Sequence, residues 1–221
     1  MRDAFIIAGG SFEESVFDSF LKKEKERPCF IAADSGLMRY KELGLVPDVI
    51  VGDFDSGGGA ALKAARELSR ENGTYLKILN PVKDDTDTES ALDQAMSRTD
   101  GRIFIFGGTG TRLDHVTANI EILAKALKRG RKAYLIDRWN LIQVCDSNNP
   151  LTIGKNDQYG RFVSVFPLSG SVVLSLEGFK YPLSDFELSY GTSLGESNEI
   201  EDEQGAITVR EGTLTVIESR D

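Results

Sequence analysis

The sequence holds a single histidine, His115, and only two cysteines, Cys29 and Cys145, among 221 residues. One histidine excludes a metal centre built from several histidines and leaves any Ser-His catalytic triad dependent on His115. The two cysteines form no CxxC pair, so a zinc site of that kind is excluded as well. Each cysteine lies in an apolar run typical of a strand, and we expect both to be buried and reduced.

An excess of positive charge is also lacking, because 26 Lys and Arg face 35 Asp and Glu, for a net charge of −9. This balance excludes a nucleic acid or an anionic membrane held by overall charge, so any phosphate must be bound locally. The early apolar run Ala4–Ala8 is too short for a signal peptide, and no run approaches the roughly 20 residues of a membrane span. We expect a cytoplasmic protein with no nucleic-acid or membrane partner.

Short apolar runs alternate with amphipathic ones through the first two-thirds of the chain. The apolar runs, which we expect to be buried strands, are Ala4–Ala8, Cys29–Ala33, Val49–Val51, Tyr75–Leu79, Ile103–Phe106 and Ala133–Ile136. The runs with helical spacing are Phe12–Glu24, Gly36–Leu43, Ala60–Glu71, Thr86–Ser97 and Asp114–Arg129. The alternation predicts an α/β domain over residues 1–140, with a mainly parallel sheet covered by helices on both faces.

The pattern changes after about Asn140, where a turn cluster at 146–150 is followed by short strand-like segments without helical periodicity. These segments are Arg161–Pro167, Ser171–Leu176, Phe179–Leu183, Ala206–Val209 and Thr213–Ile217. Glycines mark the turns between them. Residues 141–221 are therefore predicted to form a second, all-β domain, a small antiparallel sandwich or barrel.

Aspartates follow three of the predicted strands: Asp34 the second, Asp53 and Asp55 the third, and Asp84, Asp85 and Asp87 the fourth. Because the carboxyl ends of parallel strands meet at one edge of a sheet, we expect these side chains to converge. In an extended segment Asp53 and Asp55 would point the same way, with Phe54 packed on the opposite side. A single aspartate at a strand end is more often a helix cap, but a cluster favours Mg²⁺ with phosphate oxygens.

The fifth predicted strand runs into the segment GGTGTRLDH at 107–115. Its glycines let the backbone approach an anion, and a helix starting near Asp114 offers N–H groups and a positive dipole end. The segment matches neither the Walker loop nor GxGxxG. It predicts a phosphate site to which Gly9 and Gly10, after the first strand, add a second flexible approach.

Three further side chains near these segments have a structural and a functional interpretation. Lys83, beside the aspartates, is either a surface lysine or a phosphate contact, and we favour phosphate. Thr86 with Glu89 fits a capping box that opens the next helix. His115 is either a structural hydrogen-bonding group or a functional one, and its place beside Arg112 favours a functional role.

Four segments resemble, in order and spacing, the motifs of the thiamine pyrophosphokinase family: Asp34-Ser35-Gly36, GDFDS at 52–56, KDDTDTE at 83–89 and GGTGTRLDH at 107–115. Two later segments, GFKYPL at 178–183 and GTSLGESNE at 191–199, look like the thiamine-side signatures of that family. The resemblance implies an N-terminal nucleotide-binding domain and a C-terminal β-sandwich that binds thiamine and forms a homodimer, with the thiamine site at the subunit interface.

The resemblance also implies an activity, in which the pyrophosphoryl group of ATP passes to the hydroxyl of thiamine and yields thiamine diphosphate and AMP. Mg²⁺ would be held by Asp53, Asp55 and Asp84, with Asp34 and Asp87 close by. The residues expected to bind nucleotide are Gly9, Gly10, Asp34, Thr86, Gly107, Gly108, Gly110, Arg112, Asp114 and His115. The residues expected to contact thiamine are Tyr181, Ser193, Ser197 and Asn198.

Such a transfer needs positioning and charge neutralisation more than a protein nucleophile. The catalytic set would be Asp53, Asp55, Asp84, Asp87, Lys83 and Arg112, with Asp87 a candidate for accepting the hydroxyl proton. A Mg²⁺-dependent nucleotide phosphohydrolase, in which the same aspartates activate water, is the enzymatic alternative. A thiamine or nucleotide sensor is the non-enzymatic one, although converging carboxylates would destabilise a protein that only binds.

Overall fold

The computed structural model describes residues 1–54, 59–80, 85–168 and 170–221. Within these residues the parallel strands are β1 (Ala4–Ile7), β2 (Cys29–Ala33), β3 (Val49–Gly52), β4 (Tyr75–Ile78), β5 (Ile103–Phe106) and β6 (Ala133–Ile136). The helices that follow the first five strands are α1 (Glu14–Leu21), α2 (Gly36–Glu42), α3 (Ala60–Asn72), α4 (Asp87–Arg98) and α5 (Leu113–Lys128). The predicted α/β alternation is confirmed.

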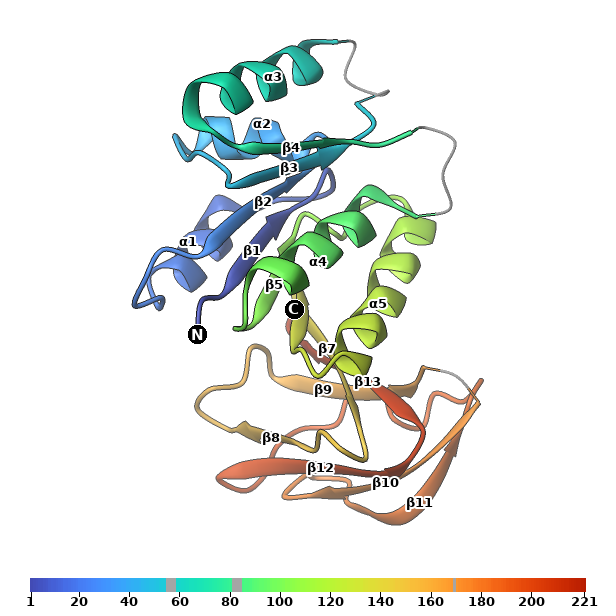
Figure 1. Cartoon of the computed structure of the whole chain (residues 1–221). Coiled ribbons are helices and arrows are strands. Elements are labelled where there is room, and N and C mark those ends of the chain that lie inside the picture. Colours follow the sequence, from blue (N-terminus) through green and yellow to red (C-terminus); the bar gives the residue numbers. More distant parts are fainter. Residues whose placement is uncertain (55–58, 81–84, 169) are drawn as a thin grey trace.

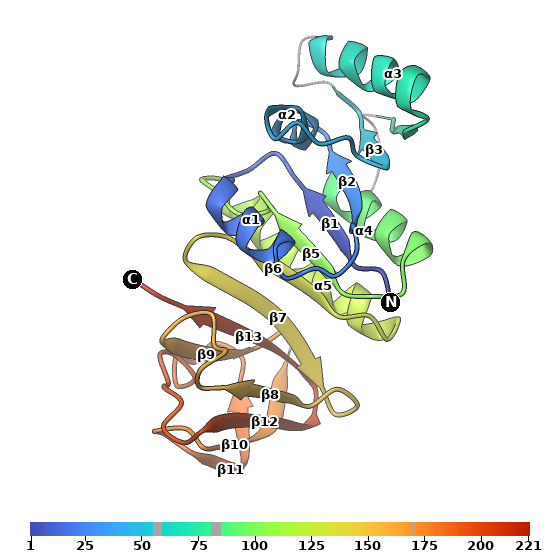
Figure 2. The same ribbon diagram turned by 90° about the vertical axis from the view of Figure 1, so that its left-hand side faces the viewer.

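The central strand is β1, which is buried along its whole length and lies between β2 and β5 in the order β4-β3-β2-β1-β5-β6 (Figure 1). Successive side chains of a strand point to opposite faces. Phe5 and Ile7 pack in one apolar cluster with α1, α2 and α3, whereas Ala4 and Ile6 pack in another with α4 and α5 (Figure 2). Helices therefore cover both faces of the sheet, as predicted.

The strand β4 is the outermost strand at one side of the sheet, so the prediction that it is buried is wrong. Among the described strands it pairs with β3 alone, and Tyr75 and Ile78 are 47% and 51% exposed. The apolar composition of the run hides this, because composition does not report how many strands flank another. The guanidinium of Arg98 lies 4.4 Å from the centroid of the Tyr75 ring and covers part of the edge.

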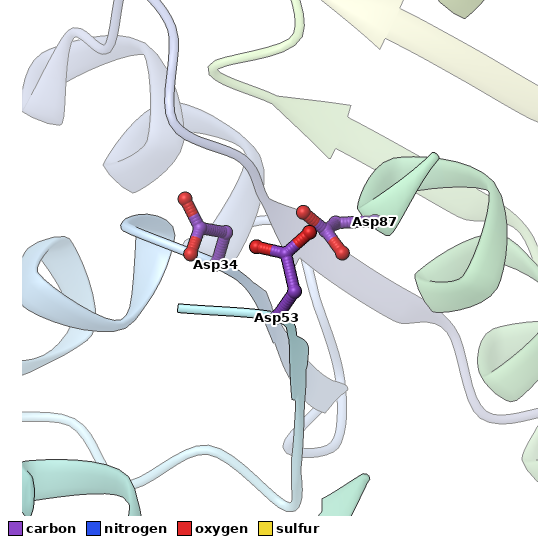
Figure 3. Close-up of side chains that lie close together, drawn as sticks. All are labelled: Asp34, Asp53 and Asp87. Carbon is purple, nitrogen blue, oxygen red and sulfur yellow. The ribbon is translucent and has the colours of Figure 1, made fainter. Parts of the chain in front are cut away.

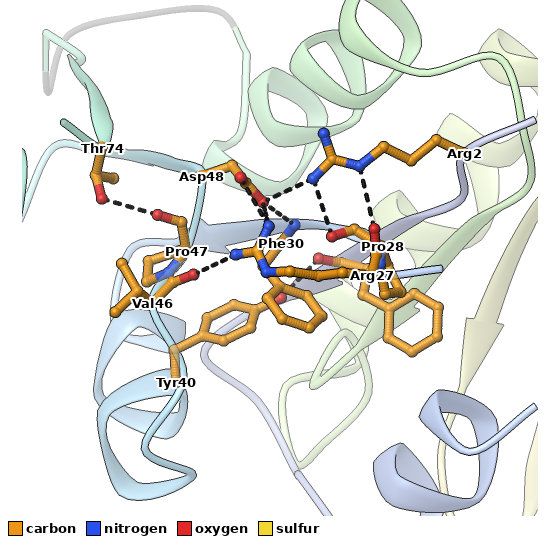
Figure 4. Close-up of polar contacts among 10 residues, drawn as sticks. Arg2, Arg27, Pro28, Phe30, Tyr40, Val46, Pro47, Asp48 and Thr74 are labelled. Carbon is orange, nitrogen blue, oxygen red and sulfur yellow. Dashed lines mark hydrogen bonds and ion pairs between the residues drawn. The ribbon is translucent and has the colours of Figure 1, made fainter. Parts of the chain in front are cut away.

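Arginine–aspartate contacts tie the amino ends of the first strands together (Figure 4). Asp48, just before β3, accepts hydrogen bonds from Arg27 at 2.8 and 2.9 Å and from the N–H of Phe30 at 2.8 Å. Arg2 reaches the same carboxylate at 3.3 Å and also donates to the carbonyls of Arg27 and Pro28. These contacts fix β1, β2 and β3 relative to one another at the amino edge.

The second part of the chain consists of β7 (Asn140–Asp146), β8 (Leu151–Gly154), β9 (Phe162–Pro167), β10 (Ser171–Glu177), β11 (Leu183–Ser189), β12 (Gln204–Glu211) and β13 (Thr213–Ser219). An antiparallel extension of the first sheet continues from β6 through β7 and β13 to β9. A second sheet, in the order β11-β10-β12-β8, packs against it over a separate apolar core (Figures 1 and 2). The predicted all-β sandwich is confirmed.

Two features of the second part depart from the predicted strands. The prediction of a strand at Phe179–Leu183 is wrong, because β11 begins at Leu183 and Phe179 forms only an isolated bridge with Ile200. Pro182 has no N–H for a sheet ladder, and most side chains of β11 are exposed, so the strand lacks an apolar stripe. The sequence patterns also do not predict β8.

Both cysteines are buried and free, as expected. Burial raises the pKa of the Cys29 thiol, and it raises the pKa of the Cys145 thiol to about 12. Within the described ranges, the chain forms no helix with the length and apolar character needed to cross a membrane.

Candidate functional site

Three aspartates meet at the carboxyl edge of the sheet (Figure 3). Asp34 follows β2, Asp53 follows β3 and Asp87 begins α4. One carboxylate oxygen of each lies within 4.8 Å of the others, and all three residues are half-buried. Hard divalent cations such as Mg²⁺ prefer carboxylate oxygens, and a cation there would offset the mutual repulsion of the three groups. The donor set therefore fits Mg²⁺.

Two residues at this edge have left-handed backbone conformations, Asp34 with φ 48° and Phe54 with φ 57°. The N–H of Asp34 still donates to the carbonyl of Val51 at 2.7 Å, so the chain turns directly after its last sheet hydrogen bond. A left-handed conformation at a large side chain such as Phe54 costs about 1 to 2 kcal/mol and often marks a functional site. The strained turn at Phe54 comes directly after Asp53.

The turn at Phe54 corrects one step of the sequence argument. The sequence predicts an extended segment from Asp53 to Asp55, in which the two carboxylates would point the same way. At Phe54 the chain is not extended. The phenyl ring is 5% exposed and packs into the core, as expected. The strand alternation that the prediction assumed therefore ends at Phe54.

The structure brings together some of the predicted aspartates. Asp53, a predicted metal ligand, lies with Asp34 and Asp87, which were expected close by. Asp55, Lys83 and Asp84 lie outside the described residues. The convergence that the strand-end argument predicts is thus present for one aspartate of each of the three loops.

The start of α4 is capped by Thr86, whose side-chain oxygen accepts a hydrogen bond from the N–H of Glu89 at 3.1 Å. This is one half of the predicted capping box. The carboxylate of Glu89 instead accepts a hydrogen bond from Lys125 of α5 at 2.8 Å, and Lys125 also reaches Asp93 at 2.9 Å. The ion pairs join α4 to α5 and so hold Asp87 relative to the glycine-rich loop that precedes α5.

A cavity of about 440 Å³ opens beside the aspartates. Its walls come from the loop after β1, the loop after β2, the start of α4 and the segment from β5 into α5, and they include Gly9, Gly10, Asp34, Thr86, Asp87 and Gly107–Arg112. A volume of this order suits a small-molecule ligand. The predicted phosphate loop thus shares one cavity with Asp34 and Asp87, and Asp53 lies beside these two aspartates.

Glycine is required where the loop after β1 touches the loop after β5. The N–H of Gly10 donates to the carbonyl of Gly107 at 2.7 Å, and a Cβ at Gly10 would lie 2.1 Å from the carbonyl oxygen of Thr109. Gly107 has φ +66°, a conformation that glycine adopts without strain. Gly10 therefore has a packing role in the loop contact in addition to its place in the cavity wall.

At the other side of the cavity, Arg112 precedes α5 and pairs with Asp114. The hydrogen bond from Arg112 lowers the pKa of the Asp114 carboxyl. Arg112 and His115 line the cavity, whereas Asp114, predicted to bind nucleotide, holds the guanidinium of Arg112 from outside the cavity wall. Both side chains of the pair are mostly exposed, at 68% and 65%, so the guanidinium is accessible to a ligand.

The predicted thiamine contacts lie in the second part of the chain. Tyr181 is 61% exposed, and Ser193 and Ser197 are exposed as well. Asn198 is buried, and its side-chain oxygen accepts hydrogen bonds from the N–H groups of Tyr181 and Glu199 while its amide donates to the carbonyl of Tyr181. These bonds make Asn198 a support for the Tyr181 segment.

One residue that lines the cavity was not predicted from the sequence. Asn119 of α5 is 6% exposed, lines the cavity and donates a hydrogen bond to the carbonyl of Gly108 at 2.7 Å. It lies on the buried face of α5 with Leu123 and Ala126, three or four residues apart. A polar residue on an otherwise apolar helical stripe was the available signal.

Comparison with known proteins assigns both parts of the chain to one family. The model for the thiamin pyrophosphokinase catalytic domain matches residues 20–135, and the model for its vitamin B1 binding domain matches residues 149–214. A thiamine pyrophosphokinase of Bacillus subtilis (strain 168) is 33% identical over 222 residues, which cover 100% of both chains.

Solved structures agree over the full length. A crystal structure of the Bacillus subtilis thiamine pyrophosphokinase superposes with a TM-score of 0.85 at 31% identity and covers 100% of both chains. The thiamin pyrophosphokinase of Geobacillus thermodenitrificans gives a TM-score of 0.83 at 32% identity, covering 100% of this chain and 98% of the other. The order of motifs, the two-part fold and these full-length matches show that the chain belongs to the thiamine pyrophosphokinase family of enzymes.

Proposed function

We propose that this enzyme transfers the pyrophosphoryl group of ATP to the hydroxyl of thiamine, in a Mg²⁺-dependent reaction that yields thiamine diphosphate and AMP. The observation that carries the proposal is the meeting of Asp34, Asp53 and Asp87 beside a cavity that Asp34 and Asp87 line together with the glycine-rich loop. A triphosphate needs both a cation and backbone N–H donors, and the cavity offers a place for each.

The aspartates are proposed to hold the cation. Asp34, Asp53 and Asp87 are the described candidates, and Asp55 and Asp84, which lie outside the described residues, remain proposed ligands from the same loops. Bound Mg²⁺ supplies neutralisation of the charge on the phosphate oxygens. Because Asp87 lies within the cluster, we assign it to the cation before any role as proton acceptor.

The glycine-rich loop and the residues after it are proposed to hold the phosphates. Gly107, Gly108 and Gly110 line the cavity with Arg112 and His115. The guanidinium of Arg112 adds positive charge where negative charge develops during transfer, a type of stabilisation that is commonly the largest single catalytic effect. Lys83, outside the described residues, is proposed to act in the same way.

The thiamine site is proposed to lie on the second part of the chain, residues 141–221, and to be completed by a second subunit. The exposed ring of Tyr181 and the exposed side chain of Leu194, 61% and 60% exposed, belong to the two segments that resemble thiamine signatures. Large apolar side chains left in solvent commonly mark a binding or subunit surface. Ser193 and Ser197 lie in the same segments, and Asn198 supports Tyr181.

A coupled assay of AMP release, with and without thiamine, tests the proposal. We expect AMP and thiamine diphosphate in equal amounts, formed only when thiamine and Mg²⁺ are both present. Inorganic phosphate released without thiamine would instead identify a nucleotide phosphohydrolase. Light scattering on the purified protein checks the homodimer separately, since a monomer that is fully active would contradict the shared thiamine site.

A further inference from the structure

Each carbonyl from Phe106 to Thr109, where β5 leads into the glycine-rich loop, has a hydrogen-bond donor. Three donors are backbone N–H groups of the segment after β1: Ala8 to Phe106 at 2.8 Å, Gly10 to Gly107 at 2.7 Å and Ser11 to Thr109 at 2.7 Å. The fourth carbonyl, that of Gly108, accepts from the side-chain amide of Asn119 at 2.7 Å. The side chain of Asn119 therefore donates to the one of these four carbonyls that receives no hydrogen bond from the segment after β1.

The direction of these carbonyls sets the direction of the N–H groups. In a trans peptide the N–H of one residue points opposite to the carbonyl of the residue before it, and the described chain has no cis peptide. Fixing the carbonyl of Gly108 toward Asn119 therefore directs the N–H of Thr109 the other way. Within the described part of the chain, the N–H groups of Gly108, Thr109 and Gly110 have no protein acceptor, and all three residues line the cavity.

Among the described residues, Asn119 donates to the one carbonyl of the run 106–109 that receives no hydrogen bond from a backbone N–H group. A carbonyl turned into the cavity would repel an anion and would also turn away the N–H that follows it. Gly108 is closely packed on its core side, where a Cβ would lie 2.5 Å from Leu135 and 3.2 Å from Ile105. The side chain of Asn119 is itself fixed by burial on α5. Asn119 thus holds the carbonyl of Gly108 from the buried face of α5.

We propose that Asn119 is a positioning residue for the polyphosphate tail of the nucleotide, acting through the carbonyl of Gly108. The inference rests on the proposed function, because it takes the cavity to be the site of that tail. Asn119 need not touch the phosphates. It keeps the peptide between Gly108 and Thr109 in the orientation that presents a donor to them.

Calorimetric titration with inorganic tripolyphosphate, in the presence of Mg²⁺, tests this role on the whole protein. Asn119→Leu keeps the approximate size of the side chain and removes the donor, and Asn119→Ala serves if the leucine variant is unfolded. We expect tripolyphosphate to bind about tenfold more weakly, the change that corresponds to roughly 1.4 kcal/mol for one misdirected donor. The KM for ATP rises in the same way, while the KM for thiamine stays unchanged.

Asn140→Ala is the matched control. The amide of Asn140 donates to Asp137 at 3.1 and 3.3 Å in the turn between β6 and β7, and Asn140 is not part of the cavity wall. The control variant loses a side-chain amide of the same kind and should bind tripolyphosphate like the wild type. Equal loss of binding in both variants would show a general effect of destabilisation and would overturn the proposal.

The outcomes separate the inference from the proposed function. Folded Asn119→Leu that binds tripolyphosphate as tightly as the wild type overturns the role of Asn119, whatever the reaction. A wild type that forms no thiamine diphosphate but binds tripolyphosphate through Asn119 overturns the proposed function and leaves the role of Asn119 standing.

Discussion

Carboxylates have different surroundings at the amino edge and at the carboxyl edge of the parallel sheet, that is, at the two ends of its strands. At the amino edge, Asp48 accepts hydrogen bonds from Arg27 and Arg2 (Figure 4), and buried Asp3 accepts them from Arg102 at 2.6 and 2.9 Å. At the carboxyl edge, three aspartates lie within 4.8 Å of one another (Figure 3). The same residue type joins strands at one edge and gathers negative charge at the other.

The difference separates stability from function. A carboxylate that accepts several hydrogen bonds from arginine stabilises the fold, because removal of the acid leaves its donors without a partner. Carboxylates brought close together disfavour one another's ionised form, and this arrangement is of use when a cation binds. We therefore expect substitutions at the amino edge to change stability and those at the carboxyl edge to change activity.

The largest effect is expected at the carboxyl edge. Asp53→Asn should lower turnover about 100-fold or more, on the scale of losing one key electrostatic stabiliser of a transition state. Steady-state rates of AMP formation at saturating ATP and thiamine measure it. Asp48→Asn is the matched control, because it removes a carboxylate from the other edge and should leave the turnover of the folded enzyme unchanged. Near-normal turnover in Asp53→Asn would contradict a catalytic role for the carboxyl edge.

A smaller effect, on stability, is expected at the amino edge. Asp48→Ala removes the acceptor for Arg27 and for the N–H of Phe30, and should lower the free energy of unfolding by about 2 kcal/mol. Urea denaturation measures it. The exposed pair of Arg39 and Glu42 provides the contrast, since Glu42→Ala should change stability by less than about 0.5 kcal/mol. Equal losses in the two variants would contradict the special role of Asp48.

A third kind of carboxylate differs from both groups, because amide groups and not arginine hold it. Glu218 of β13 is buried and accepts hydrogen bonds from the N–H of Tyr159 at 2.7 Å and from Gln143 at 3.3 Å. Burial raises the pKa of Glu218, although these hydrogen bonds oppose the rise. Between the ordinary pKa of a glutamate and the raised pKa of the folded state, the folded protein keeps a proton that the unfolded chain has lost, so stability falls as the pH rises through this interval.

Glu218→Gln should remove this dependence, since the amide carries no charge at any pH. We expect its melting temperature to exceed that of the wild type at neutral pH by a few degrees, the shift that about 1 kcal/mol produces in a chain of this size. In acid, below the ordinary pKa of a glutamate, the two proteins should melt together. Thermal unfolding followed across this pH range tests the sign, and a lower melting temperature for Glu218→Gln at neutral pH would refute it.

The sequence predicts most of the first sheet because parallel strands buried on both faces are continuous apolar runs, as in Ala4–Ile7. The prediction is wrong where apolar composition and burial of the strand do not coincide. Tyr75–Ile78 is apolar apart from Lys77 but is the outermost strand of the sheet, and Leu183–Ser189 is a strand whose side chains are mostly exposed. Exposure of a strand depends on its neighbours in the sheet, which local composition does not contain.

The site, too, has features that the sequence predicts and features that it does not. The convergence of Asp34, Asp53 and Asp87 follows from their places at strand ends and at the start of α4, which the sequence shows. The left-handed turn at Phe54 and the hydrogen bond from Asn119 to Gly108 depend on contacts between segments distant along the chain. Residue type alone does not favour either, because phenylalanine rarely adopts that conformation and an asparagine within a helix is ordinarily a surface residue.

Mn²⁺ binding, followed by the loss of the free-ion signal in electron paramagnetic resonance, tests whether the carboxyl edge holds a divalent cation. The wild type should bind Mn²⁺ and release it to excess Mg²⁺, while Asp34→Asn, Asp53→Asn and Asp87→Asn should each bind it far more weakly, with Asp48→Asn like the wild type. Undiminished Mn²⁺ binding in all three folded variants would show that the carboxyl edge does not hold the cation.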